Sequence, residues 1–375
     1  MTILALQVIW FILVGVVIAG YALLGGYDMG VGAAYLFDRS EKDRFQMMRT
    51  IGPYWGANQI WLVTAGGGLF AAFPFVFATV FSGFYLAMVL VLVGLIIRTI
   101  GVEFRHQMDT PTWNKVWDAG FGIGSILVSI LLGVATGNVL RGIPLDVDTN
   151  YAGSFFGLLS PYAVLMGVLS LALFAWHGAN YLIATSDSPL KNKASGWSKN
   201  AWMAVAALMV ILTGWTFAAS PHLTVNFKNM PLLYVAPLVA FAGIALYPVL
   251  KTKMPCCGAI ASSALAILGM VGTAGASLFP RLVPNLNSVG EYNPTAFADF
   301  TSSHLADSLT IMNASSSQFT LTVMFIVAAI GVPTVLLYTI YVYVKMGKSN
   351  PEPELAATTP ASIPGKKGKS KKSRG

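Results

Sequence analysis

The stretch GGYDMGVG, residues 25–32, decides how this chain is interpreted. It lies near the end of an apolar run that begins near Leu4 and ends at Phe37, and it places Asp28 among four glycines. A charged side chain at the centre of a membrane helix costs about 2.5–3.5 kcal/mol on insertion scales. An acid in such a run is therefore a candidate functional residue, and the glycines are candidates for close helix packing.

The composition is that of a polytopic membrane protein. Of the 375 residues, 55% are hydrophobic and 10% are charged, and the mean hydropathy is +0.68. Soluble domains carry about 25% charged residues. The first apolar run is too long for a signal peptide and lacks a basic start and a cleavage-like site, which indicates a retained span.

Apolar length and periodicity predict an all-α fold with about nine transmembrane helices. The expected spans are 5–37, 57–77, 79–102, 117–140, 157–184, 200–219, 231–250, 257–280 and 318–344. The second and third are almost continuous, and we expect a tight turn near Phe81-Ser82-Gly83, or just before it, to separate them.

Basic residues alternate between the two sides of this expected topology. The loops after even-numbered spans hold only Arg141, Lys228 and Arg281 of the 23 Lys and Arg residues. By the positive-inside rule, the N-terminus lies outside and the C-terminus lies in the cytoplasm. The net charge of +8 is therefore mostly a topology signal and does not indicate a nucleic-acid partner.

Polar side chains gather toward the expected cytoplasmic side of the first four spans. They are Asp28, Asn58, Gln59, Trp61, Arg98, Glu103 and Asp118. If these spans pack together, the side chains form a buried polar cluster that could line a proton or oxygen route. We expect Asp28 to be functional or to pair with Arg98. The structural alternatives are that Arg98 and Glu103 snorkel to the interface and that Asp118 caps a helix.

The glycines have a plainer interpretation. Gly26 and Gly30 form a small-xxx-small pair on the first span, and Gly66 to Gly68 form a second flat face on the next span. Such faces let helices approach closely. We therefore expect both sets to be packing surfaces.

The histidine content argues against a haem held by this chain. A membrane haem needs axial ligands, usually His or Met, on facing helices. Of the four histidines, only His177 falls within an expected span. The 15 methionines leave a His/Met or single-ligand site open, but we expect neither haem nor metal here. His177 is interpreted as a hydrogen-bonding or proton-relay residue.

A weak internal echo links two spans that run in the same direction. GAAYL at 32–36 ends the first span, and GANYL at 178–182 ends the fifth. The echo favours a parallel duplication of a four-helix unit over an inverted repeat.

Several ordered blocks carry a resemblance to a known family. They are GGYDMGVG (25–32), WGANQIWLVTAGGGLFAAFP (55–74), FSGFYLAMVLVL (81–92), RTIGVEFR (98–105), WDAGFGIGS (117–125), GVATGNVLRGIPLD (133–146) and SLTIMNASSSQFTLTVM (308–324). Over nearly its full length, the chain resembles subunit II of the cytochrome bd quinol oxidases.

The resemblance implies a non-haem core subunit of a complex in the bacterial cytoplasmic (inner) membrane. Such a complex oxidises quinol, reduces dioxygen to water and contributes to the proton-motive force. In that family, haems b558, b595 and d lie in the larger partner, subunit I, so the isolated chain is expected to be inactive. The other expected partners are quinol, dioxygen, membrane lipid and a small single-helix subunit. A structural quinone is a further expectation.

The resemblance also implies two four-helix bundles plus a peripheral helix, needed for stable haem assembly. We expect a single transmembrane domain, 1–347, and a disordered basic cytoplasmic tail, 348–375. The expected parts of the domain are a first four-helix unit (1–150), a second unit (151–282), an external loop (283–317) and a last helix (318–347).

Two positions depart from the family pattern, which is DGFDMGVG in the first block and W-D-G-N-[QE] in the second. Gly25 and Gly56 replace two acids, so Asp28 is the only one of the three that remains. Those acids belong to what the family suggests is a cytoplasmic proton path. Asp28 and Glu103 remain for such a path, or protons enter through the partner. We expect Asp28 to be retained mainly for structure, paired with Arg98.

Two other classes of function stay open. A secondary transporter also places acids in helices broken by glycine, but it favours inverted repeats and a midplane site. A purely structural assembly subunit would take no part in proton movement, and the loss of two acids favours it. Substitutions at Asn58, Gln59 and Trp61 would discriminate, because a scaffold predicts changes in haem content rather than in turnover. We assign no catalytic residue to this chain.

Overall fold

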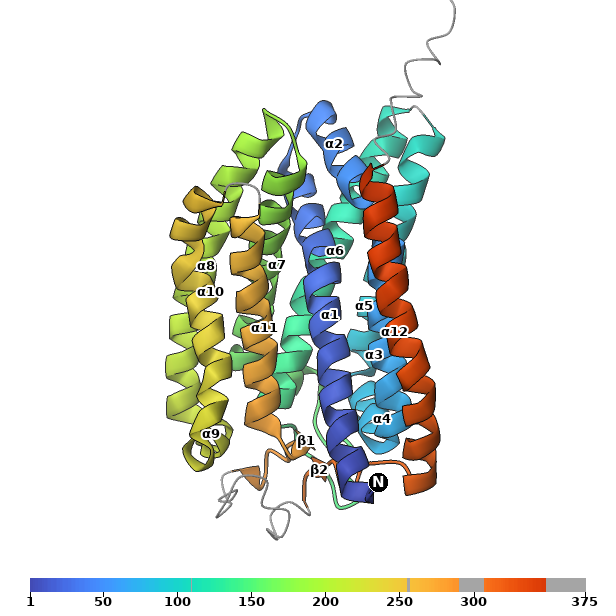
Figure 1. Ribbon diagram of the computed structural model, residues 1–375, viewed down its shortest axis with the longest axis vertical. Helices are drawn as coiled ribbons and strands as arrows, with labels where there is room; N and C mark the ends of the chain where they lie inside the picture. The colour runs from blue at the N-terminus through green and yellow to red at the C-terminus, as the bar shows by residue number, and fades with distance from the viewer. Residues whose placement is uncertain (109, 255–256, 290–306, 349–375) are drawn as a thin grey trace, which may run out of the picture.

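The computed structural model describes residues 1–108, 110–254, 257–289 and 307–348, and these are almost entirely helical (Figure 1). The long helices are α1 (Ile3–Phe37), α3 (Trp55–Ala72), α5 (Tyr85–Phe104), α6 (Pro111–Arg141), α7 (Pro161–Thr185), α8 (Leu190–Ala219), α10 (Val235–Lys253), α11 (Gly258–Leu278) and α12 (Gln318–Lys348). The short helices are α2 (Glu41–Ile51), α4 (Pro74–Gly83), α9 (Val225–Asn229), η1 (Arg105–Gln107), η2 (Phe155–Leu158), η3 (Pro221–Leu223) and η4 (Pro231–Tyr234).

Two four-helix units lie side by side (Figure 1). Helices α1, α3, α5 and α6 form the first unit, and α7, α8, α10 and α11 form the second. Helices α1 and α6 pack against α7 and join the units, while α12 packs against α3 and α1. The expected all-α membrane fold, with two four-helix bundles and a peripheral helix, is confirmed.

The described helices account for the expected number of spans. Eight single helices are long and apolar enough to cross a membrane, and α3 with α4 makes a ninth candidate that is bent by 117°. The expected second span, 57–77, is wrong at its end. Helix α3 stops at Ala72 because Pro74 starts a new helix and keeps Phe73 out of helical geometry. Helix α4 then ends at Gly83, so the turn expected at 81–83 is displaced to Phe84.

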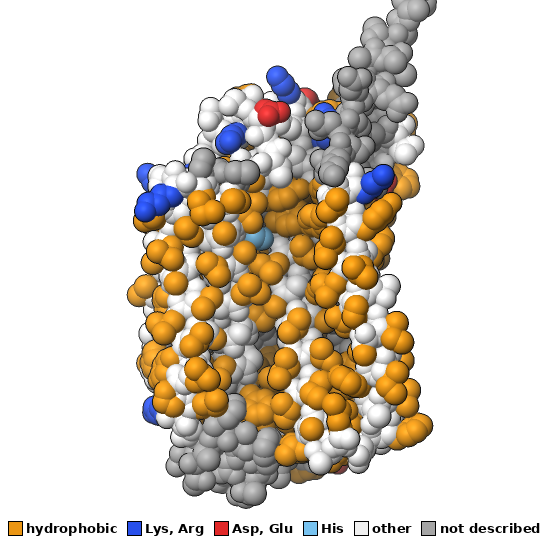
Figure 2. Space-filling view, in the orientation of Figure 1, with side chains coloured by type: hydrophobic (Ala, Val, Ile, Leu, Met, Phe, Trp, Pro, Cys, Tyr) orange, Lys and Arg blue, Asp and Glu red, His pale blue; other side chains and the backbone are white. Residues whose placement is uncertain are grey.

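The two ends of the molecule differ in charge. Figure 2 shows a broad belt of hydrophobic side chains, with most of the visible Lys and Arg at the end where α2 lies. We call this the α2 end, and the opposite one, which holds the chain start, α4 and α9, the N-terminal end (Figure 1). The alternation of basic loops in the sequence therefore corresponds to two physical ends of one helical bundle.

Helix α2 lies in a segment that the sequence suggested only as a loop. Ser40 caps it, since its Oγ accepts a hydrogen bond from the Asp43 backbone N–H at 3.3 Å. Three of its apolar residues, Met47, Met48 and Ile51, are buried against the bundle. The helix therefore closes the α2 end over the side chains of α1 and α7.

The two glycine surfaces have different environments. A Cβ on Gly26 would lie 2.8 Å from the Phe174 ring, and one on Gly30 would lie 1.8 Å from the Phe174 carbonyl oxygen. The predicted close packing at this pair is confirmed. A Cβ on Gly66 or Gly67 would meet no atom within 4 Å. The predicted packing is therefore wrong for Gly66 and Gly67 within the described chain, whereas a Cβ on Gly68 would make an ordinary contact of 3.7 Å with Val14 of α1.

At the N-terminal end, β1 (Arg281–Val283) pairs antiparallel with β2 (Leu309–Thr310) and closes the base of the expected external loop. The rest of that loop, 290–306, and the expected tail from residue 349 onward lie outside the described residues.

Candidate functional site

The first polar group at the α2 end surrounds Asp28. This side chain is 1% exposed on α1, and its Oδ2 accepts a hydrogen bond of 2.9 Å from Asn58 Nδ2 on α3. Its Oδ1 has no hydrogen-bond partner in the described chain. The structure thus brings together Asp28 and Asn58 of the expected polar cluster, and the carboxyl group keeps one oxygen available for a proton or a further donor.

Asn58 is the hub of this group. Its Nδ2 also donates to Tyr27 Oη at 2.7 Å, and its Oδ1 accepts from Tyr343 Oη at 2.8 Å. The Tyr27 and Tyr343 hydroxyls are hydrogen-bonded to each other. One amide therefore connects α1, α3 and α12. Tyr27 lies within GGYDMGVG, beside the predicted acid, but no sequence signal relates Tyr343 to this site.

Other predicted members lie at the edge of the group or outside it. Trp61 Nε1 donates to Thr339 Oγ1 at 3.3 Å and forms a second link between α3 and α12. Gln59 is only half-buried, and Glu103 is exposed. Including Glu103 in a buried cluster was wrong, because the last turn of α5 directs that residue to the surface.

Arg98 does not form the predicted ion pair with Asp28. Its side chain is buried, and its Nε donates to Ser125 Oγ on α6 at 3.4 Å. No nitrogen of Arg98 lies within 4.0 Å of an acidic oxygen among the residues placed by the structure. Asn58 takes the position next to the acid that we had expected Arg98 to occupy.

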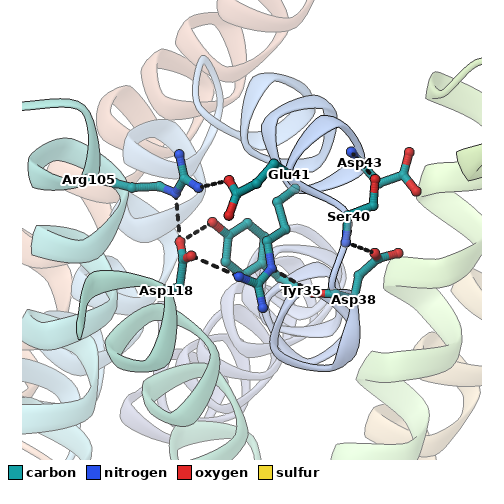
Figure 3. A network of polar contacts seen from close by, with 8 residues as sticks. Tyr35, Asp38, Ser40, Glu41, Asp43, Arg105 and Asp118 are labelled. Atoms are coloured by element: carbon teal, nitrogen blue, oxygen red, sulfur yellow. Dashed lines mark hydrogen bonds and ion pairs between the residues drawn. The ribbon is translucent and has the colours of Figure 1, made fainter. Parts of the chain in front are cut away.

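The second polar group surrounds Asp118, which lies inside α6 and does not cap it. Arg44 donates to its Oδ2 at 2.9 Å, and Arg105 Nε donates to its Oδ1 at 2.6 Å. Tyr35 Oη also donates to Oδ1, as Figure 3 shows. Arg105 NH2 also reaches Glu41 at 2.6 Å. Asp118 was predicted as a site residue, but neither arginine was. Its contacts with Arg44, Arg105 and Tyr35 suit an electrostatic anchor for α2.

Arg105 lies outside the membrane-spanning helices, and two effects act on its pKa. Burial lowers the pKa, but the hydrogen bonds to Asp118 and Glu41 outweigh burial, so that the pKa is raised above the ordinary value of arginine. The guanidinium therefore stays charged at all physiological pH values. Arg105 therefore serves as a fixed positive charge and not as a proton carrier.

A third group anchors α2 to the second unit. Lys193 Nζ of α8 lies 3.1 Å from Asp38 Oδ2 and 2.6 Å from Asp43 Oδ2. Both carboxylates are buried, whereas the lysine side chain is 42% exposed. Figure 3 shows Asp38 and Asp43 on the side of the α2 segment away from Asp118. Ion pairs therefore hold α2 to both units.

His177 belongs to a separate network within the second unit. Its Nδ1 lies 2.7 Å from Ser263 Oγ, and Ser263 accepts from Asn180 Nδ2 at 3.0 Å. Ser198 donates to Asn180 Oδ1 at 2.5 Å and contacts the Tyr247 hydroxyl. This network joins α7, α8, α10 and α11, so the hydrogen-bonding interpretation of His177 has a structural basis.

Comparison with known proteins identifies the family. The model of the family described as cytochrome bd terminal oxidase subunit II matches residues 6–346. The chain belongs to the cytochrome bd terminal oxidase subunit II family. Family membership makes it a subunit of a bd-type terminal oxidase and gives it a role in an oxidoreductase complex.

Individual members of the cytochrome bd subunit II family agree with this assignment. The chain is 35% identical to the probable cytochrome oxidase subunit 2 of Haemophilus influenzae over 371 residues, covering 91% of this chain and 94% of that protein. It is 35% identical to the cytochrome bd-I ubiquinol oxidase subunit 2 of Escherichia coli K12, with the same coverage of both chains. It is 33% identical to the cytochrome bd ubiquinol oxidase subunit 2 of Bacillus subtilis, covering 91% of this chain and 96% of that protein.

The fold agrees with that of a solved bd oxidase. A chain of the bd oxidase from Geobacillus thermodenitrificans superposes with a TM-score of 0.72 at 15% sequence identity. The match covers 92% of this chain and 99% of that chain. The shared architecture is that of the multi-pass bd oxidase subunits.

The two histidines of this bd oxidase subunit whose side chains the structure describes, His177 and His222, do not fit a bis-histidine haem site. His177 Nδ1 contacts Ser263, and His222 Nε2 contacts the Leu140 carbonyl at 3.0 Å near the opposite end of the molecule. The two rings are therefore held apart and are already hydrogen-bonded. Within the described ranges, no three His, Cys, Asp or Glu side chains gather into a metal-binding group.

Proposed function

We propose that the chain is the non-haem core subunit of an oxidase that transfers electrons from quinol to dioxygen and forms water. Its partner is a larger subunit I that holds haems b558, b595 and d and the quinol site, so the isolated chain has no activity. The family assignment and the ubiquinol oxidase names of the relatives support this proposal. The hydrogen-bonded histidines of this chain are consistent with haem ligation by the partner alone.

The chain resides in the bacterial cytoplasmic membrane, with the α2 end facing the cytoplasm and the N-terminus outside. The concentration of Lys and Arg at the α2 end supports this orientation by the positive-inside rule (Figure 2). In the same orientation, the Asp28 group lies toward the side from which protons for water would be drawn. The four-helix units at 1–150 and 151–282 form one scaffold for the partner and support haem assembly there.

The single observation that carries a proton role is the buried carboxyl group of Asp28 with one oxygen unpaired. An intramembrane acid is costly, and it is kept where it accepts, holds or releases a proton. Asn58 orients the carboxyl group through its bond to Oδ2. Gly56 lies on an exposed turn of α3, two residues before Asn58, where a Cβ would meet no atom within 4 Å. That open turn is a point at which water at the α2 end approaches the group.

A structural quinone does not enter this proposal. The recess between α1 and α12 has a volume of about 220 Å³ and is lined by Leu13, Phe325, Ala328, Ala329, Val332 and Pro333. No side chain in this lining donates a hydrogen bond to a quinone carbonyl. Its chemistry suits a hydrocarbon chain or a nonpolar gas such as dioxygen.

Copurification tests membership of the oxidase. The chain is tagged, extracted from its native membrane in mild detergent, and examined by reduced-minus-oxidised spectroscopy and mass spectrometry. We expect a larger partner together with haem bands. A colourless chain that comes alone from membranes that contain such a partner would contradict the oxidase role and favour a transporter.

Substitution of Asp28 separates a proton role from a scaffold role. We expect Asp28→Asn in the whole oxidase to keep its haem content while turnover with excess quinol falls by about tenfold or more, as for loss of a proton-transferring group. Glu103→Gln is the matched control, since it removes an exposed acid at the same end. Unchanged turnover of Asp28→Asn overturns the proton role, and loss of haem supports the structural alternative.

A further inference from the structure

Two buried polar atoms near the Asp28 site lack a hydrogen-bond partner among the described residues, and a buried arginine from α5 lies close to them with one long hydrogen bond. Tyr21 Oη and Asp28 Oδ1 are fully buried atoms without a hydrogen bond to any described residue. Arg98 is 4% exposed, and the one side-chain hydrogen bond that it makes to a described residue is the long contact to Ser125. Because water does not solvate the hydrocarbon depth of a bilayer, unsatisfied polar groups there cost several kcal/mol each.

Sequence spacing places two of these groups on one face of α1. Tyr21, Gly25 and Asp28 follow each other at i, i+4 and i+7, which aligns them along the helix. A Cβ on Gly25 would lie 2.5 Å from the Tyr21 ring, so the ring lies over the space that a side chain at position 25 would fill. The missing side chain at Gly25 therefore lets the tyrosine extend along α1 toward the turn that holds Asp28.

Arg98 approaches the same region from α5. Its Nε bonds Ser125 Oγ, which would lie 2.1 Å from a Cβ on Gly32, about one helical turn from Asp28 on α1. Arg98 nevertheless lies more than 4.0 Å from either carboxyl oxygen of Asp28. Gly124 of α6 makes room for its stem, because a Cβ there would lie 3.3 Å from Arg98 Cβ. The guanidinium is thus held near the acid without touching it.

The Tyr21 hydroxyl makes no hydrogen bond within the described part of the chain, and its ring belongs to an apolar cluster. It packs in an apolar cluster with Val17, Met29, Trp61, Ala65, Val128 and Phe174. The Trp61 indole N–H is already bonded to Thr339. A small hydrogen-bonding molecule between the three groups would satisfy them, and buried water commonly takes this role when two or more polar partners surround it.

We propose that Tyr21, Asp28 and Arg98 enclose an internal water site, in which Tyr21 is the positioning residue for the proton held on Asp28. The occupant is water, because one water molecule can accept a hydrogen bond from Tyr21 Oη and donate one to Asp28 Oδ1. The exchange is balanced: a hydronium ion in the site and the Asp28 carboxylate give water and the neutral acid, and the reverse step returns the proton. Arg98 stabilises the carboxylate state. The proton-carrying part rests on the proposed function, whereas the water site itself does not.

The first test is structural and uses the whole oxidase. We expect a cryo-EM map that resolves ordered water to show density about 3 Å from both Tyr21 Oη and Asp28 Oδ1. An empty region, or an Arg98 guanidinium in direct contact with Asp28, overturns the proposal. The presence or absence of this water in the map does not depend on turnover. Failure of the water site is therefore distinguishable from failure of the proposed proton role of Asp28.

The second test examines the Asp28 proton by infrared difference spectroscopy. The carbonyl band of the neutral acid is identified as the band that Asp28→Asn removes. We expect Tyr21→Phe to shift this band to higher frequency at unchanged haem content, because the water loses one hydrogen-bonding partner. Tyr162→Phe, which removes a hydroxyl bonded to Thr216 in the second unit, is the control. A band unchanged by Tyr21→Phe, or the absence of any Asp28 band, overturns the positioning role of Tyr21.

Discussion

Gly30 of α1 and Gly178 of α7 are in direct backbone contact. A Cβ built on Gly178 would lie 2.5 Å from the carbonyl carbon of Gly30, and a Cβ on Gly30 would lie 2.9 Å from the Gly178 nitrogen. Neither position can carry a side chain unless the helices separate. The two four-helix units are therefore joined two residues from Asp28 on α1 and next to His177 on α7, so the packing of the units also positions both polar networks.

Gly178→Ala should weaken this junction. Overpacking of a close contact costs about 1–3 kcal/mol, and here the clash is with the backbone, which relaxes less than a side chain. We expect a lower unfolding temperature and less haem per purified complex. Gly67→Ala is the control, because that Cβ would point into open space and alanine is the better helix former. Equal stability of the two variants would contradict the backbone contact.

The sequence was sufficient to predict the helices and several of their contacts. Long apolar runs located the spans, and the small-xxx-small spacing of Gly26 and Gly30 indicated a real helix crossing. The echo between GAAYL and GANYL marked segments of α1 and α7, the two helices that meet at Gly30 and Gly178. These features depend on local composition and spacing, which a single sequence displays directly.

The remaining features depend on contacts between distant residues. Asn58 and Tyr343 are 285 positions apart, and no periodicity relates them. The choice of Asn58 rather than Arg98 as the direct partner of Asp28 depends on how α5 is rotated against α6. The outward direction of Gly66 and Gly67 depends on the rotation of α3. Helical periodicity identifies a face but does not specify which neighbour covers it.

Asp118→Asn should destabilise the α2 end strongly. It removes the carboxylate shared by Arg44 and Arg105, whose side chains are 16% and 8% exposed. Removal of one partner from a buried ion pair costs about 3–5 kcal/mol, because the other charge stays buried without compensation. Faster proteolytic cleavage of the α2 segment in the purified oxidase would be the measured effect.

Glu41→Gln is the control for this prediction, since it also removes a partner of Arg105. The Glu41 side chain is 69% exposed, so its loss should cost less than about 1 kcal/mol. Cleavage rates that change equally in both variants would contradict the assignment of Asp118 as the anchor of α2.

The pH dependence of stability should include a contribution from His222. Burial lowers the pKa of His222 from its ordinary value of 6.5 to about 4; the hydrogen bond to the Leu140 carbonyl opposes this shift, and Arg281 adds to it. Between about pH 4 and pH 6.5, His222 therefore binds more protons in the unfolded chain than in the folded chain. The contribution is fully present above pH 6.5 and is lost as the pH falls toward 4, by up to about 1.4 kcal/mol per pH unit.

Thermal unfolding of the purified oxidase at several pH values between 4 and 7 measures this slope. His222→Gln retains a side-chain donor for the Leu140 carbonyl but does not titrate. We expect the variant to unfold at a temperature that depends less on pH in this window than the unmodified chain does. An identical pH profile for the two would exclude His222 as the source.

Tyr343→Phe should loosen the attachment of α12 to the first unit. It removes the hydroxyl that donates to Asn58 and contacts Tyr27, which leaves a buried amide oxygen without that donor. An unsatisfied buried polar group costs about 1–3 kcal/mol. Helix α12 has few other polar attachments to the first unit, and Trp61–Thr339 is the one nearest this site. Faster amide hydrogen exchange in the last turns of α12 is therefore expected.

Tyr341→Phe is the matched control, since Tyr341 is 62% exposed two residues earlier on the same helix. If both variants exchange at the unmodified rate, the Asn58 hub does not hold α12 in place.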